Sequence, residues 1–176
     1  TALIEAANVI QWALYYPGVL DVDELPLPQD QRRELADSLA AYRSGDMLAA
    51  VEKYPAGRVP ASDGERVYLA ALLMVVGQIE QSETLLDMAV RKDGARETIA
   101  QLADALRKTI AAVHGRKLAD SRESTLATDS MAESYYHQSR SDLSKALQAA
   151  RNATYLAANF GFAWVRVAEL EFGFGR

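Results

Sequence analysis

The sequence predicts an all-α protein made of consecutive helical hairpins, and three observations lead to this prediction. Apolar residues recur at the three- and four-residue spacing of a helical face through residues 29–176. No segment of that region has the two-residue alternation expected of a β-sheet. Turn residues stand at Gly45, Gly77, Ser141 and Gly175, and the middle interval is about twice as long as either of the others. This spacing indicates a repeated unit of about 34 residues.

Composition sets limits on the class of protein. The chain has 176 residues, of which 49% are hydrophobic and 24% charged, as in a folded domain of ordinary size. A net charge of −5 argues against nucleic-acid binding, which needs a basic surface. There is no Cys, so disulfide and thiolate chemistry are excluded. The longest apolar run, residues 67–77, is about half the length that spans a bilayer, so no membrane insertion is expected.

Residues 1–28 differ from the rest of the chain. They mix β-branched and aromatic residues around a Pro17–Gly18 turn signal, and a short strand, a short helix and an extended arm all remain open. No basic region precedes the first apolar residues, so no signal peptide is expected. Because the chain opens at Thr1 and stops inside a periodic pattern, we expect it to be part of a longer protein.

The remaining elements follow from apolar spacing and breakers. A helix is expected over residues 29–44, ending at Gly45, and Asp46 is expected to cap a short helix that Pro55 stops. Residues 65–76 are apolar nearly all round and should form a covered helix, followed by another over 79–93. Residues 95–115 should form one longer helix. A polar loop is expected over 116–130, then helices over 131–140, 142–160 and 161–174.

Small and apolar residues recur at fixed places around each turn. Small residues ahead of a turn let the two helices of a hairpin approach closely, and small residues after the turn keep the second helix near the first. Apolar and small residues further along fill the seam with the next unit. These signature residues are Gly45, Ala50, Ala70, Gly77, Ala89, Ser141, Ala146, Ala153, Trp164, Ala168 and Gly175.

This pattern resembles the tetratricopeptide repeat (TPR), a helix–turn–helix unit of about 34 residues. The resemblance covers roughly residues 29–176 and is best in FAWVRVAELEFGFG. It implies a TPR-like α-α superhelix, a right-handed solenoid, with units at about 31–62, 63–94, an irregular 95–126, 127–160 and a truncated 161–176, after an N-terminal arm, linker or cap at 1–28. The Pro that usually ends a unit is replaced by Gly94 and Ala158.

A narrower resemblance concerns VIQWALYYPGVLD, AYRSGD and the segment from TLATDS to the end. These are similar to bacterial proteins in which tetratricopeptide repeats follow an iron-dicitrate-sensor (FecR-type) domain. The resemblance implies an exported, periplasmic, multi-domain scaffold, with residues 1–22 as the tail of, or the link from, the upstream domain. Without it, a cytoplasmic location stays open.

The sequence lacks the common motifs of catalytic and metal sites. His114 and His137 lie in different units, and neither has a His or Cys partner at helical spacing, so no metal site is expected. No phosphate-binding, nucleophile-elbow or zinc-protease motif is present. We therefore predict no enzyme activity and no cofactor. The aromatic cluster Trp12, Tyr15 and Tyr16 is interpreted as packing on the first repeat, with a docking patch as the alternative.

The predicted function is a protein-interaction scaffold whose concave groove, formed by the first helix of each unit, binds a peptide or protein segment. A basic clamp for a peptide carboxylate is not favoured, because Arg32, Arg43 and Arg166 are its only candidates. A helical accessory domain of a larger sensor or enzyme is one alternative. Self-assembly is another, as a homodimer through the uncovered final helix, where Trp164 and Phe172 lack cover. The expected groove residues are Leu35, Leu39, Tyr42, Val67, Ala71, Met74, Met131, Tyr135, Gln138, Val165 and Glu169.

Overall fold

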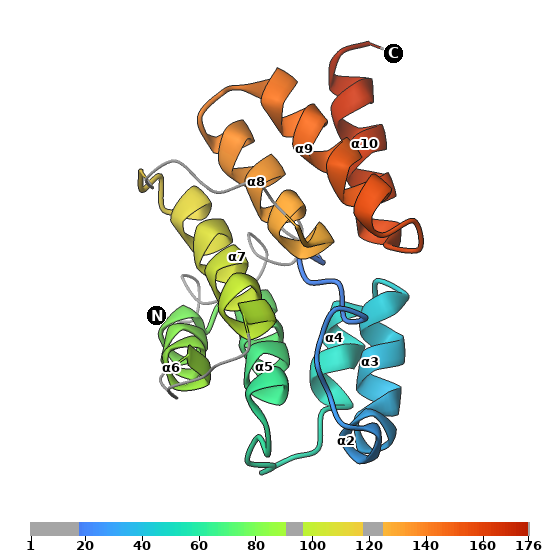
Figure 1. Ribbon diagram of the computed structural model, residues 1–176, viewed down its shortest axis with the longest axis vertical. Helices are drawn as coiled ribbons and strands as arrows, with labels where there is room; N and C mark the ends of the chain where they lie inside the picture. Colours follow the sequence, from blue (N-terminus) through green and yellow to red (C-terminus); the bar gives the residue numbers. More distant parts are fainter. Residues whose placement is uncertain (1–17, 91–96, 118–124, 176) are drawn as a thin grey trace. The chain divides into compact units, whose positions relative to one another are not determined.

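A computed structural model describes residues 18–90, 97–117 and 125–175 (Figure 1). Across these residues the regular structure is entirely α-helical, without a β-strand. No described helix is long and apolar enough to cross a membrane. The helices are α2 (Gln29–Glu34), α3 (Ala36–Arg43), α4 (Met47–Glu52), α5 (Asp63–Val75), α6 (Ile79–Val90), α7 (Glu97–Val113), α8 (Ala127–Ser139), α9 (Leu143–Leu156) and α10 (Gly161–Gly173).

The chain divides into two compact units, which are described separately. The first includes Val22–Ala103, and the second combines Val19–Asp21 with Asp104–Arg176, so the division falls within α7. In the first unit α3 packs on α4 and α5 on α6, and in the second unit α9 packs on both α8 and α10. Short turns make the pairs α3–α4, α5–α6 and α8–α9 antiparallel hairpins (Figure 1). The helices thus follow the expected hairpin order.

The hairpin turns use the predicted residues. The backbone φ angle is positive at Gly45 (87°), Gly77 (74°) and Ser141 (62°). This left-handed conformation reverses the chain after the first helix and is costly for a residue with a Cβ atom, so Ser141 carries strain that the two glycines avoid. The residues that follow start the second helices: the carboxylates of Asp46 and Asp142 accept hydrogen bonds from backbone N–H groups three residues on, at 3.0 and 3.1 Å.

Small residues bring the hairpin helices into direct contact. The Ser38 hydroxyl on α3 donates to the Ala50 carbonyl on α4 at 2.6 Å, and the Ser82 hydroxyl on α6 donates to the Ala70 carbonyl on α5 at 2.9 Å. All four residues are fully buried. A side chain can reach the main chain of a neighbouring helix only when the two axes lie close together, which small residues permit.

The long connection between α4 and α5 is held by a buried carboxylate. Glu65 is completely buried and accepts hydrogen bonds from Arg58, from the Tyr54 hydroxyl at 2.9 Å and from the Ala61 N–H at 3.0 Å. Burial alone would raise the pKa of Glu65, but the bonds from Arg58, Ala61 and Tyr54 outweigh it and lower that pKa. Arg58 also pairs with Glu34 at 2.7 Å. These contacts tie the connection to α2 and α5.

Helix α8 begins at Ala127, earlier than the start at residue 131 predicted from sequence. The polar residues of its first turn made this stretch resemble a loop, but they have partners in the fold. The Thr128 hydroxyl accepts a hydrogen bond from the Asp21 N–H at 2.8 Å, and the Ser130 hydroxyl accepts one from the Asn152 side chain at 2.9 Å. Both hydroxyls are therefore buried inside the second unit rather than solvated.

An arginine lies in the core between α8 and α10. Arg166 is 2% exposed, and its guanidinium stacks 4.2 Å from the ring centre of Tyr135. It donates to the Ser134 hydroxyl at 3.0 Å, to the Gln138 side chain and to the Glu169 carboxylate at 2.8 Å. The contact of α10 with α9 is apolar, where Leu170 packs with Ala146, Leu147 and Ala150. Helix α10 is thus fixed to its hairpin by both polar and apolar contacts.

Candidate interaction surfaces

Most residues predicted to line a groove are in the core. Three are exposed, Gln138, Glu169 and Val165, the last at 66%. The prediction of an open first-helix face is therefore wrong for the larger part of that set, since a buried side chain cannot meet a partner. The buried members, none more than 5% exposed, are Leu35, Leu39, Tyr42, Val67, Ala71, Met74, Met131 and Tyr135.

The N-terminal segment, residues 18–28, is largely buried and contacts the first turns of two first helices. It has no helix or strand, yet its Val and Leu side chains are no more than 7% exposed. In the second unit its Asp21 N–H bonds to Thr128 at the start of α8. In the first unit a Cβ atom on Gly64, at the start of α5, would lie 3.1 Å from the Pro26 carbonyl oxygen. The buried apolar side chains of the segment are Val19, Leu20, Val22, Leu25 and Leu27.

These two contacts are equivalent in the repeat. Gly64 precedes the turn at Gly77 by the same number of positions as Thr128 precedes the turn at Ser141. At both positions the main chain of residues 18–28 approaches the first turn of a first helix. The N-terminal segment therefore makes a contact of the same kind in each unit.

The arginines considered for a carboxylate clamp are also engaged within the chain. Arg32 donates to the Leu25 carbonyl at 2.6 Å, and Arg43 pairs with Asp23 at 2.5 Å. Arg166 is buried as described above. All three hold helices or the N-terminal segment in place, so their positions give no support to a clamp for a partner's carboxylate.

Helix α10 exposes an apolar surface, here named the α10 face, formed by Trp164, Val165, Ala168 and Phe172. Trp164 is 53% exposed and Phe172 82%. At 100° per residue these four side chains fall within one arc of about 100°, opposite the buried Ala163, Arg166 and Leu170. The Trp164 indole N–H donates to the Ala158 carbonyl at 2.8 Å, so the polar atom of this ring is satisfied while its apolar part meets solvent.

The edges of the α10 face carry two carboxylates that are already paired. Glu169 accepts from Arg166 at 2.8 Å, and Glu171 pairs with Arg151 of α9. The helical angles place these carboxylates on opposite sides of the face. The face is therefore apolar in the middle and bordered by neutralised ion pairs, an arrangement typical of protein contact surfaces.

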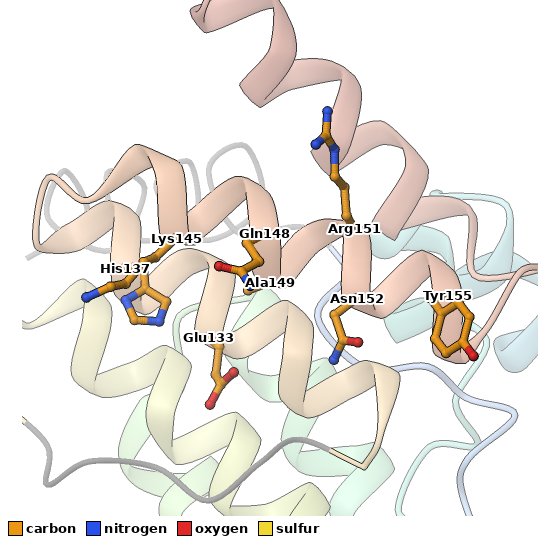
Figure 2. A pocket seen from close by; sticks show the side chains of 8 residues that line it. All are labelled: Glu133, His137, Lys145, Gln148, Ala149, Arg151, Asn152 and Tyr155. Carbon is orange, nitrogen blue, oxygen red and sulfur yellow. The ribbon is translucent and has the colours of Figure 1, made fainter.

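A hollow of about 580 Å³ lies on the α8–α9 hairpin (Figure 2). Figure 2 shows His137 and Lys145 together at one end and Tyr155 at the other. Its charged groups already have partners: Glu133 pairs with Lys108 at 3.3 Å and Lys145 with Asp142 at 3.2 Å. The hollow thus offers no set of converging free groups for a ligand. Its lining residues are Glu133, His137, Lys145, Gln148, Ala149, Arg151, Asn152 and Tyr155.

Other predicted residues fall outside any shared site. His114 is exposed just after α7, while His137 lies in the hollow on α8. In the described ranges no three His, Cys, Asp or Glu side chains gather in a way that could hold a metal ion. The aromatic cluster Trp12, Tyr15 and Tyr16 lies outside the described residues.

The signature residues are found in turns and helix contacts. The signature residues that lie within the hairpin helices are fully buried. On α10, by contrast, Trp164 and Ala168 are exposed. Gly175, after α10, has a positive φ of 72° like the hairpin turns. The buried members are Ala50, Ala70, Ala89, Ala146 and Ala153.

No protein-family model, curated protein or solved structure matches the chain. The likeness to tetratricopeptide repeats therefore depends on the sequence pattern set out above.

Proposed function

We propose that this protein is a non-catalytic protein-interaction scaffold of the tetratricopeptide-repeat type. The observation that carries the proposal is the α10 face. Contiguous exposed apolar surface is uncommon on soluble proteins and usually marks a contact site. Trp164 and Phe172 supply the large aromatic side chains that dominate binding energy at protein interfaces.

The proposal assigns different roles to the two surfaces. The first-helix faces already receive the N-terminal segment of the same chain, which contacts the first turns of α5 and α8. Its contacts combine buried leucines with a backbone hydrogen bond, from the Asp21 N–H to Thr128. A partner's segment on these faces would have to replace those contacts, whereas the α10 face is open for binding without any displacement.

The proposal is tested with the full chain as bait in extracts of cells that express it naturally. Phe172→Glu places a charge in the middle of the α10 face, where it would be desolvated on binding. Tyr155→Glu is the matched control, because Tyr155 is 85% exposed on α9 and outside the face. Circular dichroism must show that both variants remain folded.

We expect the wild-type protein and Tyr155→Glu to retain the same proteins and Phe172→Glu to lose them. The proposal fails if nothing is retained by the wild type, or if Phe172→Glu retains the same proteins in the same amounts.

A further inference from the structure

The α10 face is symmetric about one small residue. Trp164 lies four residues before Ala168 and Phe172 four residues after it, so one aromatic side chain stands about 6 Å along the helix on either side of the alanine. A surface with this arrangement is self-complementary. When two such helices cross in opposite directions at Ala168, each Trp164 meets the Phe172 of the other helix.

Ala168 occupies a repeat position that elsewhere receives an antiparallel helix. It precedes the turn at Gly175 by the same number of positions as Ala70 precedes Gly77. Ala70 is fully buried, and its carbonyl accepts the hydrogen bond from Ser82 of α6. Ala168 is exposed in the described structure. An antiparallel helix with a small residue at the crossing point therefore fits this position, whether the same chain or another copy supplies it.

We infer that this occupant is α10 of a second copy, and that the protein forms a two-fold symmetric dimer through the α10 face. This inference rests on the proposed function, because it names the partner of the same surface. A two-fold interface uses one patch on both subunits, so the patch must complement itself. The Trp164–Ala168–Phe172 arrangement meets that condition, with the two alanines allowing the helix axes to approach closely.

The charges at the edges permit this pairing. Two copies would bring acidic residues close to each other, which would oppose association if the carboxylates were free. Glu169 is paired with Arg166 and Glu171 with Arg151 within each copy. The approaching edges therefore carry ion pairs rather than net negative charge.

The area of the α10 face determines the affinity expected for the dimer. Aromatic side chains contribute on the order of 150–250 Å² each when fully buried, so the partly exposed α10 face offers roughly 400 Å² per copy. A total of about 800 Å² is below the range of permanent dimers. We therefore expect reversible dimerisation with a dissociation constant on the order of 10–100 μM.

Sedimentation velocity of the purified full chain from about 1 to 500 μM tests the inference over the concentration range set by that affinity. The wild type should pass from monomer to dimer, Phe172→Glu should weaken the dimer at least tenfold, and Tyr155→Glu should leave it unchanged. The expected loss follows from burying a charge in an apolar contact.

Cysteine cross-linking tests the two-fold geometry separately. The chain contains no Cys, so Ala168→Cys introduces one thiol at the proposed axis. Under mild oxidation Ala168→Cys should form a covalent dimer much faster than Tyr155→Cys, which places a thiol at an exposed position on α9. The closeness of two thiols at the axis is what a disulfide requires.

A wild type that stays monomeric throughout the concentration range overturns the inference, as does a dimer that Phe172→Glu does not weaken. Equal cross-linking rates for the two cysteine variants also overturn it. If the wild type is monomeric but binds a cellular partner that Phe172→Glu does not bind, the proposed function stands. Only the inference of a second copy as the occupant is then refuted.

Discussion

Replacing Arg58 with methionine removes a cation from a carboxylate that is closed to solvent. Glu65 is fully buried and paired with Arg58. In the Arg58→Met variant the hydrogen bonds from the guanidinium are replaced by contact with an apolar side chain. Leaving one charge of a buried pair without its partner typically costs about 3–5 kcal/mol. The Tyr54 hydroxyl and the Ala61 N–H still donate to Glu65, so we expect the lower end, about 3 kcal/mol.

The assay is urea denaturation followed by circular dichroism at pH 7, with Glu65→Gln and the double variant completing a mutant cycle. Glutamine can still accept from Tyr54 and Ala61, so the double variant should be less stable than the wild type by only about 1 kcal/mol. A loss below about 1 kcal/mol for Arg58→Met alone would refute the reasoning, because it would mean that the pair contributes no more than an exposed ion pair.

The dependence of this stability loss on pH gives a second test of the Arg58–Glu65 pair. The pKa of Glu65 is lowered in the folded state, so its contribution is present above the unfolded pKa of about 4.3 and is lost as the pH falls through the folded pKa. Arg58 supplies part of that lowering. The stability difference between wild type and Arg58→Met should therefore be largest near neutral pH and shrink on acidification. A difference that grows towards low pH would contradict this account.

The remaining predictions use the same denaturation assay. Ser141→Gly should stabilise the protein by about 1 kcal/mol, because it removes a Cβ atom from a positive-φ position; a loss of stability would contradict the strain. Asp142→Ala should lower the urea midpoint at pH 7, and the difference should shrink in acid, since the Lys145 N–H bond lowers the pKa of Asp142. Arg166→Met should lower the free energy of unfolding by about 2 kcal/mol, because the hydrogen bonds of Arg166 are lost; an unchanged urea midpoint would contradict this. Leu25→Ala should lower the free energy of unfolding by about 3 kcal/mol, because Leu25 is 1% exposed. An unchanged urea midpoint would mean that the N-terminal segment does not contribute to stability.

Helix order was predictable because local breakers set it. The turns at Gly45, Gly77 and Ser141 separate the hairpins as expected, and the caps at Asp46 and Asp142 start the second helices. These signals act within a few residues of each other, so they can be recognised without knowledge of the rest of the fold.

The accessible surface could not be predicted in the same way. Helical periodicity separates the faces of a helix but does not tell which distant segment covers a face. The buried groove residues illustrate this, because their own spacing does not indicate that both sides of these helices are covered. Arg166 was considered as a surface cation, yet it is buried by Tyr135, Ser134 and Gln138 on another helix. The hydroxyls of Thr128 and Ser130 similarly depend on partners far away in the sequence.

The hydrogen bond between Asp21 and Thr128 has a consequence for synthesis on the ribosome. Its two residues are separated by 107 positions, and Val19–Asp21 belongs to the unit that otherwise starts at Asp104. At about 5–20 residues per second, this segment emerges roughly 5–20 s before its site on α8 has been translated. During that interval its apolar side chains have no native cover, and closing so long a loop is a late and entropically costly step. The second unit therefore completes its core only after translation has passed α8, using residues made 107 positions earlier.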